Sequence, residues 1–366
     1  MRFPNKYLRN IKPYKLASHA IWSVKPEERE SVLKLDWNEA TIAPSPLVKQ
    51  RIEELFTQPD FFHLYPVTHN EQLLKLVAVY VGLPEDNVQY FASSDALHEY
   101  ICKVFISVGD PVMILGPSYD NFRLTCQANG ADVFFSEFNA DFTFNAAKFE
   151  KDILDKEPAV VYICNPNNPT GYCHSVDYIE HLLQTFPDTL FLVDEAYSEF
   201  SGVTAKDLVL KYDNLLISRT MSKAFALANF RFGYLMASKE NVQFVNRIRN
   251  PKNISTITQT AAQAALEDLD YMREYVRATE EGKQWFIAEM NTLPQLHVHE
   301  SRGNFVLVQL PTYEEKFALI QYLAEKNIFV RDTMQSPIVH NCFRITCGTK
   351  EQMKHVAEEI KSFYGR

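Results

Sequence analysis

Short apolar runs alternate with amphipathic helical patterns through the first two thirds of the chain. Five runs are continuous enough to be buried strands: PVMILG, ADVFFSEF, AVVYIC, TLFLVD and NLLISR, which begin at residues 111, 131, 159, 189 and 214. Strands that alternate with helices favour a mostly parallel sheet covered by helices. The pattern therefore predicts an α/β fold whose large domain spans roughly residues 45–255.

The last third of the chain has a different pattern. A long helical pattern from about Thr258 to Met290 precedes the apolar runs NFVLVQL, NIFVRDT and CFRITC, which alternate with two more helical patterns. We expect residues 1–44 and 256–366 to form a smaller α+β domain. The active site should lie between the two domains.

The composition is that of an ordinary globular protein, with 46% apolar and 23% charged residues among 366. A net charge of -9 argues against nucleic acid as a partner. The six cysteines form no CxxC pair, so we expect reduced thiols and no metal site. Residues 1–22 lack the apolar core of a signal peptide, and no run of 18 apolar residues occurs. We therefore expect a cytoplasmic protein without a membrane partner.

The segment SRTMSKAFALANFRFGY, residues 218–234, carries chemistry that suits one cofactor. Lys223 could form a Schiff base with an aldehyde, in a strand-loop-helix passage where Arg231 lies eight residues further on, about two helical turns if a helix follows. Thr220, Ser222 and Arg231 could hold a phosphate. Pyridoxal 5'-phosphate has both an aldehyde and a phosphate. Taken alone, Lys223 could equally be a solvated loop residue and Arg231 a surface charge.

Two further segments supply what the lysine lacks. The strand TLFLV should deliver Asp194 to the carboxyl end of a parallel sheet, where ligands of such sheets bind. There it could keep the pyridine nitrogen protonated, so that the ring withdraws electrons from the substrate's α-carbon. Tyr197 of DEAY and Asn168 of NPNNPTG could hydrogen-bond the ring's 3-hydroxyl. Asp194 could instead cap a helix, and NPNNPTG could be a plain turn.

The motifs NPNNPTG, DEAY, TMSK and RFGY occur in the order and at the spacing of the fold-type-I, class I/II aminotransferases. The chain resembles that family over nearly its whole length, and most closely the histidinol-phosphate aminotransferase branch. The supporting segments are KPY, LDWNEA, LYP, SSDA, GPSYDNF, VRD and FRITCGT. The resemblance implies the three-layer PLP-transferase fold and pyridoxal 5'-phosphate as cofactor. It also implies amino transfer between an amino acid donor, with glutamate expected, and a small phosphorylated ketone or amine.

The resemblance implies roles for individual residues. Lys223 would hold the cofactor and move the proton between the α-carbon and C4', and Tyr119 would stack on the ring face. The cofactor's phosphate would meet backbone N–H groups at a helix N-terminus, those of Ser94, Asp95 and Ala96. Tyr65 would reach the phosphate of the neighbouring subunit, so the expected active unit is a homodimer with shared sites.

Substrate choice is expected to depend on arginines, because a guanidinium binds a carboxylate or phosphate through two parallel hydrogen bonds. By the same resemblance, Arg344 of FRITCGT would grip the α-carboxylate of the donor, and Asn168 would also bind substrate. Arg331 of VRD, together with Tyr14, would bind the substrate's phosphate. Arg331 could instead be an edge-strand charge that faces water. His63, His69 and His98 are expected to be structural or surface residues.

Several positions depart from the family pattern. Ser93 and Asn229 stand where glycine is usual, and Ala96 where an acidic residue is common. The segment WNEATIAPSP lacks the second asparagine and the glycine of the common lid pattern. These departures suggest a phosphorylated substrate other than histidinol phosphate. Two alternatives remain open: a PLP-dependent decarboxylase that resembles the threonine-phosphate decarboxylases, and a catalytically silent protein with the same fold.

Overall fold

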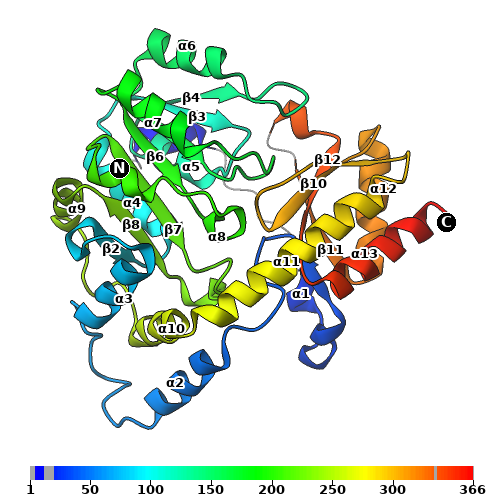
Figure 1. Ribbon diagram of the computed structural model, residues 1–366, viewed down its shortest axis with the longest axis horizontal. Coiled ribbons are helices and arrows are strands. Elements are labelled where there is room, and N and C mark those ends of the chain that lie inside the picture. Colours follow the sequence, from blue (N-terminus) through cyan, green and yellow to red (C-terminus); the bar gives the residue numbers. More distant parts are fainter. Residues whose placement is uncertain (1–4, 12–19, 334–335, 366) are drawn as a thin grey trace.

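The computed structural model describes residues 5–11, 20–333 and 336–365, and it arranges them around two sheets (Figure 1). The larger sheet has seven strands in the order β2-β8-β7-β6-β5-β3-β4. They are β2 (Val88–Phe91), β3 (Pro111–Gly116), β4 (Asp132–Glu137), β5 (Val160–Cys164), β6 (Leu190–Asp194), β7 (Leu215–Thr220) and β8 (Gly233–Ala237). Within this sheet only β8 runs against its neighbours. The five apolar runs are therefore confirmed as β3 to β7, and the sheet is mostly parallel.

Helices pack around this sheet (Figure 1). They are α2 (Pro46–Phe56), α3 (Glu71–Val81), α4 (Ser94–Phe105), α5 (Asn121–Ala128), α6 (Ala146–Lys156), α7 (Val176–Thr185), α8 (Ser198–Ser201) and α9 (Lys239–Asn246), with the 3-10 turns η3 (Glu85–Asn87), η4 (Lys206–Leu210) and η5 (Ala228–Phe230). Most of the longer helices begin after a serine or asparagine whose side chain accepts a hydrogen bond from a first-turn N–H, as Ser93 does for α4. The turn residues of the sequence thus fix where the helices start.

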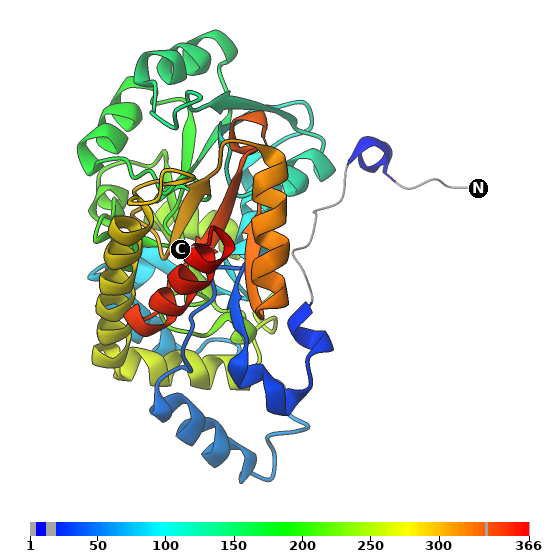
Figure 2. The ribbon, with the colours of Figure 1, turned by 90° about the vertical axis from the view of Figure 1, so that its right-hand side faces the viewer.

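The smaller sheet has the order β1-β11-β12-β10-β9. Its strands are β1 (Leu33–Leu35), β9 (His297–Val298), β10 (Phe305–Gln309), β11 (Ile328–Asp332) and β12 (Cys342–Thr346), and its helices are α11 (Leu269–Met290), α12 (Tyr313–Glu325) and α13 (Lys350–Phe363). Alternate residues of these strands share one core with all three helices, and α11 packs alongside α13 (Figure 2). The helices therefore cover one face of the sheet. On the other face, Leu307 packs against Phe142 of the larger part.

The two cores support a division into two domains, whose boundaries stay a prediction. The helix α10 (Thr256–Glu267) contributes its buried residues to the core of the larger sheet and packs on α2 and α3. The long helical pattern from Thr258 to Met290 forms two helices, because the non-helical backbone of Asp268 (φ -126°, ψ 60°) separates α10 from α11. Figure 1 shows α11 running from α10 towards the small sheet.

The N-terminal region is built from short elements: η1 (Lys6–Asn10), α1 (Ala20–Ser23) and η2 (Pro26–Ser31). It adds β1 to the small sheet, but η1 packs on α5 of the larger part, where Asn5 donates to the Ala128 carbonyl at 3.2 Å. A further 3-10 turn, η6 (Pro337–Val339), precedes β12. Among the helices of the described residues, none has both the length and the apolar character needed to cross a bilayer.

Candidate active site

The parallel strands β5, β6 and β7 end at the same edge of the large sheet. Cys164 lies beside Asp194, and Asp194 beside Ser218, in the strand register. The segments that follow these strand ends carry NPNNPTG, EAY and MSK. The topology thus brings three motifs, far apart in the sequence, to the edge where ligands of such sheets bind.

Lys223 lies three residues beyond the end of β7. Its Nζ donates a hydrogen bond to the Trp37 carbonyl at 2.9 Å and lies 6.0 Å from the centroid of the Tyr197 ring. Burial and the neighbouring Arg344 cation lower the pKa of Lys223 to about 8. A larger fraction of the amine is therefore neutral near pH 7 than in an exposed lysine, and the neutral amine is the form that attacks an aldehyde.

Asn168 and Tyr197 meet next to this lysine. The Tyr197 hydroxyl accepts a hydrogen bond from Asn168 Nδ2 at 3.2 Å and another from Asn38 Nδ2 at 3.0 Å. Burial raises the pKa of Tyr197, so its hydroxyl keeps its proton and can donate it to a bound group. Asn38 was not among the residues predicted from the sequence, although it lies in the LDWNEA segment that supported the resemblance.

Asp194 is buried at the end of β6. Its Oδ2 accepts a hydrogen bond from the Tyr162 hydroxyl at 2.8 Å, and its Oδ1 accepts one from the Ala196 N–H at 3.2 Å. The next helix, α8, begins after Tyr197, so Asp194 is not its N-cap. Burial raises the pKa of Asp194, while His98 and the Tyr162 hydrogen bond oppose that rise.

The predicted phosphate ligands also converge. Thr220 Oγ1 lies 2.9 Å from Ser222 Oγ, and Arg231 Nη1 donates to Ser222 Oγ at 3.4 Å. The helix expected between Lys223 and Arg231 is wrong: the chain makes turns and the short η5, and Ala226 and Arg231 adopt left-handed φ angles of 57° and 54°. These turns bring Arg231 back to Ser222. A straight helix of the same length would have separated the two residues.

The N-terminus of α4 borders this group. Ser93 has a φ of 95°, a conformation that favours the glycine usual in the family. A Cβ on Gly233 would lie 2.4 Å from the Ser94 backbone nitrogen, so only glycine lets β8 pass this close. Asp95 was expected to contribute only its backbone N–H to the phosphate site. Its carboxylate also accepts hydrogen bonds from the Tyr119 hydroxyl at 3.0 Å and from Arg231 Nη2 at 3.2 Å. Tyr119 is thereby tied to the phosphate ligands.

The two arginines lie on the small sheet. Arg344 is buried; its Nη1 donates to Asn168 Oδ1 at 2.6 Å and its Nη2 to the Asp36 carbonyl at 2.6 Å. Arg331 on β11 is the register partner of Arg344 on β12, and residues directly opposite each other share a face of the sheet. Their face is opposite the helix-covered core and therefore turns towards the large sheet.

Two predicted residues, Tyr14 and Tyr65, remain. Tyr14 lies outside the described residues. Tyr65 is 79% exposed on the segment between α2 and α3 (Figure 1), and the Lys252 ammonium lies 4.8 Å from its ring centroid. Its expected role in a neighbouring subunit stays a prediction.

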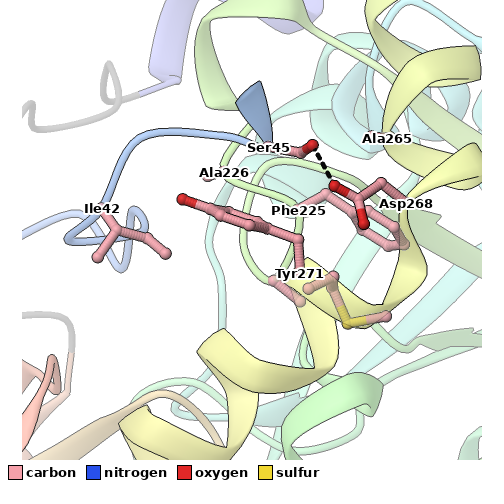
Figure 3. Close-up of a pocket in the computed structure, with 9 residues that line it drawn as sticks. Ile42, Ser45, Phe225, Ala226, Ala265, Asp268 and Tyr271 are labelled. Carbon is pink, nitrogen blue, oxygen red and sulfur yellow. Dashed lines mark hydrogen bonds between the residues drawn. The ribbon is translucent and has the colours of Figure 1, made fainter. Parts of the chain in front are cut away.

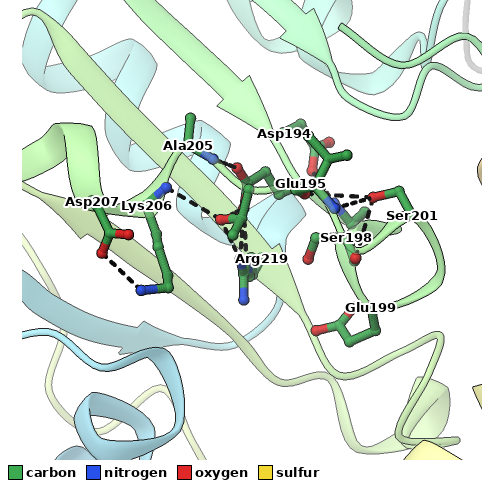
Figure 4. A network of polar contacts seen from close by, with 12 residues as sticks. Asp194, Glu195, Ser198, Glu199, Ser201, Ala205, Lys206, Asp207 and Arg219 are labelled. Atoms are coloured by element: carbon green, nitrogen blue, oxygen red, sulfur yellow. Dashed lines mark hydrogen bonds and ion pairs between the residues drawn. The ribbon is translucent and has the colours of Figure 1, made fainter. Parts of the chain in front are cut away.

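A buried ion pair between Glu195 and Arg219 joins the ends of β6 and β7 (Figure 4). Glu195 Oε2 accepts from Arg219 Nη2 at 2.8 Å, from Arg219 Nε at 3.0 Å and from the Thr204 hydroxyl at 2.7 Å. Glu195 Oε1 accepts from the Ala205 N–H at 2.7 Å. Because Glu195 follows Asp194 and Arg219 precedes Thr220, the pair fixes β6 and β7 relative to each other.

A small pocket lies beside the loop that follows Lys223 (Figure 3). It is lined by Ile42, Ser45, Ala224, Phe225, Ala226, Ala265, Asp268, Tyr271 and Met272. None of the predicted site residues lines it. Among the described residues, no group of three or more His, Cys, Asp and Glu side chains is placed to hold a metal ion.

Residues 30–360 match the family model of aminotransferase class I and II. The chain belongs to this family. It is 40% identical, over 98% of its length and 96% of the relative's, to a dihydroxyacetone phosphate transaminase of Campylobacter jejuni. It is 33% identical to a histidinol-phosphate aminotransferase of Ruminiclostridium cellulolyticum, over 90% of this chain and 91% of that one.

The solved structure of histidinol-phosphate aminotransferase from Sinorhizobium meliloti in complex with pyridoxal-5'-phosphate is similar over 99% of this chain and 98% of that one, with a TM-score of 0.84 and 25% identity. The expected family, its fold and its cofactor are thus confirmed. The protein is a PLP-dependent aminotransferase that is similar to histidinol-phosphate aminotransferases. A catalytically silent protein, one of the two alternatives, is not supported by these relatives.

Proposed function

We propose that this aminotransferase moves an amino group from glutamate to a small phosphorylated ketone of the dihydroxyacetone phosphate type. The single observation that carries this proposal is the register pair of Arg331 and Arg344 on the face of the small sheet that turns towards the large sheet. The 40% identity to a relative named as a dihydroxyacetone phosphate transaminase selects the ketone.

Two guanidinium groups directly opposite each other on a sheet repel, and a bound anion offsets that repulsion. Arg344 is the inner cation, because it contacts Asn168 and influences the pKa of Lys223. It is therefore placed to bind a group next to the reacting carbon, such as the α-carboxylate of glutamate. Arg331 lies one strand further out, where it is placed to bind a phosphate one or two carbons away.

The residues at the strand ends fit the cofactor. Lys223 would bind its aldehyde, Asp194 its ring nitrogen, Asn168 and Tyr197 its 3-hydroxyl, and Tyr119 its ring face. Its phosphate would be bound by Thr220, Ser222, Arg231 and the N–H groups of Ser94, Asp95 and Ala96. When bound, the cofactor supplies an electron-withdrawing ring that stabilises a carbanion at the substrate's α-carbon.

Lys223 would move the proton. Its low pKa leaves part of the amine neutral near pH 7, so it can accept the α-proton of glutamate and return a proton to the opposite carbon. In the complete reaction, glutamate and dihydroxyacetone phosphate give 2-oxoglutarate and 2-amino-3-hydroxypropyl phosphate. The ketone carries a hydroxymethyl group where glutamate carries its carboxylate, so Arg344 should matter more for the donor.

We also propose that the active unit is a homodimer. The segment between α2 and α3 exposes large apolar side chains, with Phe62 76% and Leu64 61% exposed beside Tyr65. Exposed apolar groups that gather on one segment are typical of an interface. A second copy of the chain would cover them and receive Tyr65 near its own phosphate ligands.

The test separates the two half-reactions. Purified holoenzyme is mixed first with glutamate and then with dihydroxyacetone phosphate, and the conversion between the aldehyde and amine forms of the cofactor is followed by absorbance in single turnovers. Arg344→Ala should slow the glutamate half. Arg331→Ala should raise the concentration of phosphorylated ketone needed for half-maximal rate by about tenfold or more, because a charge-assisted contact is lost, and should spare the glutamate half.

Equal losses in both halves for Arg331→Ala would contradict the division of roles. Faster turnover with the ketone of histidinol phosphate than with dihydroxyacetone phosphate would contradict the proposed ketone. It would favour the substrate for which the histidinol-phosphate aminotransferase relatives are named. Carbon dioxide release from phosphothreonine, without formation of the amine form, would favour the decarboxylase alternative.

A further inference from the structure

Two polar side chains from different elements lie behind Asp194 in an otherwise apolar part of the core. Tyr162 is fully buried on β5, between Val161 and Ile163. His98 is fully buried on α4, beside Leu97. A buried hydroxyl or imidazole lowers stability unless it is hydrogen-bonded, so both positions would suit an apolar residue better if packing alone decided.

Tyr162 contacts Asp194 directly. Its hydroxyl donates to Asp194 Oδ2 at 2.8 Å. A hydrogen bond to a carboxylate is about twice as strong as one between neutral groups, and it favours the ionised form of the acid. The second oxygen, Oδ1, accepts from the Ala196 N–H. These two bonds fix the plane of the carboxylate at the end of β6.

His98 lies against the same group. Its Nε2 is 2.9 Å from the hydroxyl of Ser218, the register partner of Asp194, and its ring meets the Tyr162 ring edge to face at 5.8 Å. Its Nδ1 is buried, and no described residue bonds to it. The imidazole therefore lies beside the Asp194 strand end, bonded through Nε2 to the register partner of Asp194.

The charges around Asp194 act in opposite directions. Burial raises its pKa, His98 and the Tyr162 hydrogen bond oppose that rise, and the nearby Asp95 carboxylate adds to it. Since an acid that pairs with a pyridinium must stay ionised, the groups that oppose the effect of burial determine whether Asp194 can do so.

We propose that Tyr162, His98 and Ser218 form a positioning group that keeps Asp194 ionised and aimed at the ring nitrogen of the cofactor. This inference rests on the proposed role of Asp194. In this role the three residues would contact neither substrate nor cofactor. They act through Asp194 on the electron demand of the ring, and hence on the rate of proton removal from the substrate.

The variants Tyr162→Phe and His98→Phe remove polar atoms and keep most of the volume, and Ser218→Ala is a third, milder change. The matched control is His174→Phe: His174 is also a buried histidine packed among aromatic rings, and its backbone N–H and carbonyl are hydrogen-bonded to the Asn165 side chain. The measurement is the nitrogen-15 chemical shift of the ring nitrogen in holoenzyme loaded with labelled pyridoxal 5'-phosphate, together with kcat and KM for glutamate.

The shift should move towards the unprotonated position in Tyr162→Phe and His98→Phe, and stay at the wild-type position in His174→Phe. In Tyr162→Phe, kcat should fall by about ten- to a hundredfold while KM changes little, because the lost bond is charge-assisted. A wild-type shift in Tyr162→Phe, His98→Phe and Ser218→Ala would overturn the inference. Asp194→Asn separates the proposed role of Asp194 from that of the positioning group. If this variant also leaves the nitrogen-15 shift unchanged, the proposed role of Asp194 is wrong. If it is the only variant that moves the shift, only the positioning group is wrong.

Discussion

Lys223 is held in a place that disfavours its charged form. Its pKa falls from 10.5 to about 8 because of burial and Arg344, so the folded apoenzyme binds fewer protons than the unfolded chain between those two values. Stability therefore rises with pH through that window. Below about pH 8 the charged lysine destabilises the fold in full, and above about pH 10.5 the effect is gone.

We expect Lys223→Met to unfold at higher urea concentration than the wild-type apoenzyme at pH 7. The gain should be about 1–3 kcal/mol, reduced from the full shift because the side chain is only half-buried. It should vanish by about pH 10.5. The same variant should be inactive, and borohydride should attach the cofactor to a Lys223 peptide only in the wild type. A gain that does not change with pH would mean that the lysine's charge is not the cause.

Single residues differed in how far the sequence revealed them. Lys223, Asp194 and Asn168 stood out as candidates, because each belongs to a motif whose residue types match a known chemistry, and their roles stay predictions. Tyr162 and His98 could not, because their proximity to Asp194 arises only when β5, α4 and β6 pack together. The only sequence signal for Tyr162 is that a tyrosine interrupts the otherwise apolar run AVVYIC.

At the scale of elements, the apolar runs predicted the strands well, since fully buried parallel strands need continuous apolar sequence. Helix ends were harder to predict. The break at Asp268 and the turns between Lys223 and Arg231 depend on backbone angles that contacts from other elements stabilise. In the second case, the bonds of Arg231 to Ser222 and Asp95 outweigh the helical tendency of the KAFALA sequence.

The join between β6 and β7 should depend on the Glu195–Arg219 pair. Removing one partner of a buried pair leaves a charge without its counter-ion, so Glu195→Ala should lower the free energy of unfolding by about 3–5 kcal/mol. Urea unfolding measures it. Glu274→Ala, which breaks the exposed pair with Arg277, is the matched control and should leave the midpoint unchanged. If the two variants lowered the free energy of unfolding by similar amounts, burial would not be the reason that the Glu195 pair stabilises the fold.

At the scale of the whole molecule, the proposed homodimer assigns Tyr65 to the phosphate ligands of a neighbouring chain. Within its own chain Tyr65 faces Lys252 and solvent. The sequence predicted this residue only through the family resemblance. A tyrosine in an exposed loop has no pattern of its own that distinguishes a partner's ligand from a surface residue.

Mixing two inactive variants tests the shared site. In a symmetric dimer, Lys223→Met on one chain and Tyr65→Ala on the other leave one site of the hybrid with both wild-type residues. After unfolding and refolding together, the mixture should therefore recover up to about a quarter of the wild-type rate if subunits combine at random. Each variant refolded alone should recover none beyond its own residual rate, and light scattering should report a dimer for all samples. Recovery no greater than the average of the two separate variants would mean that Tyr65 serves its own chain or no site at all.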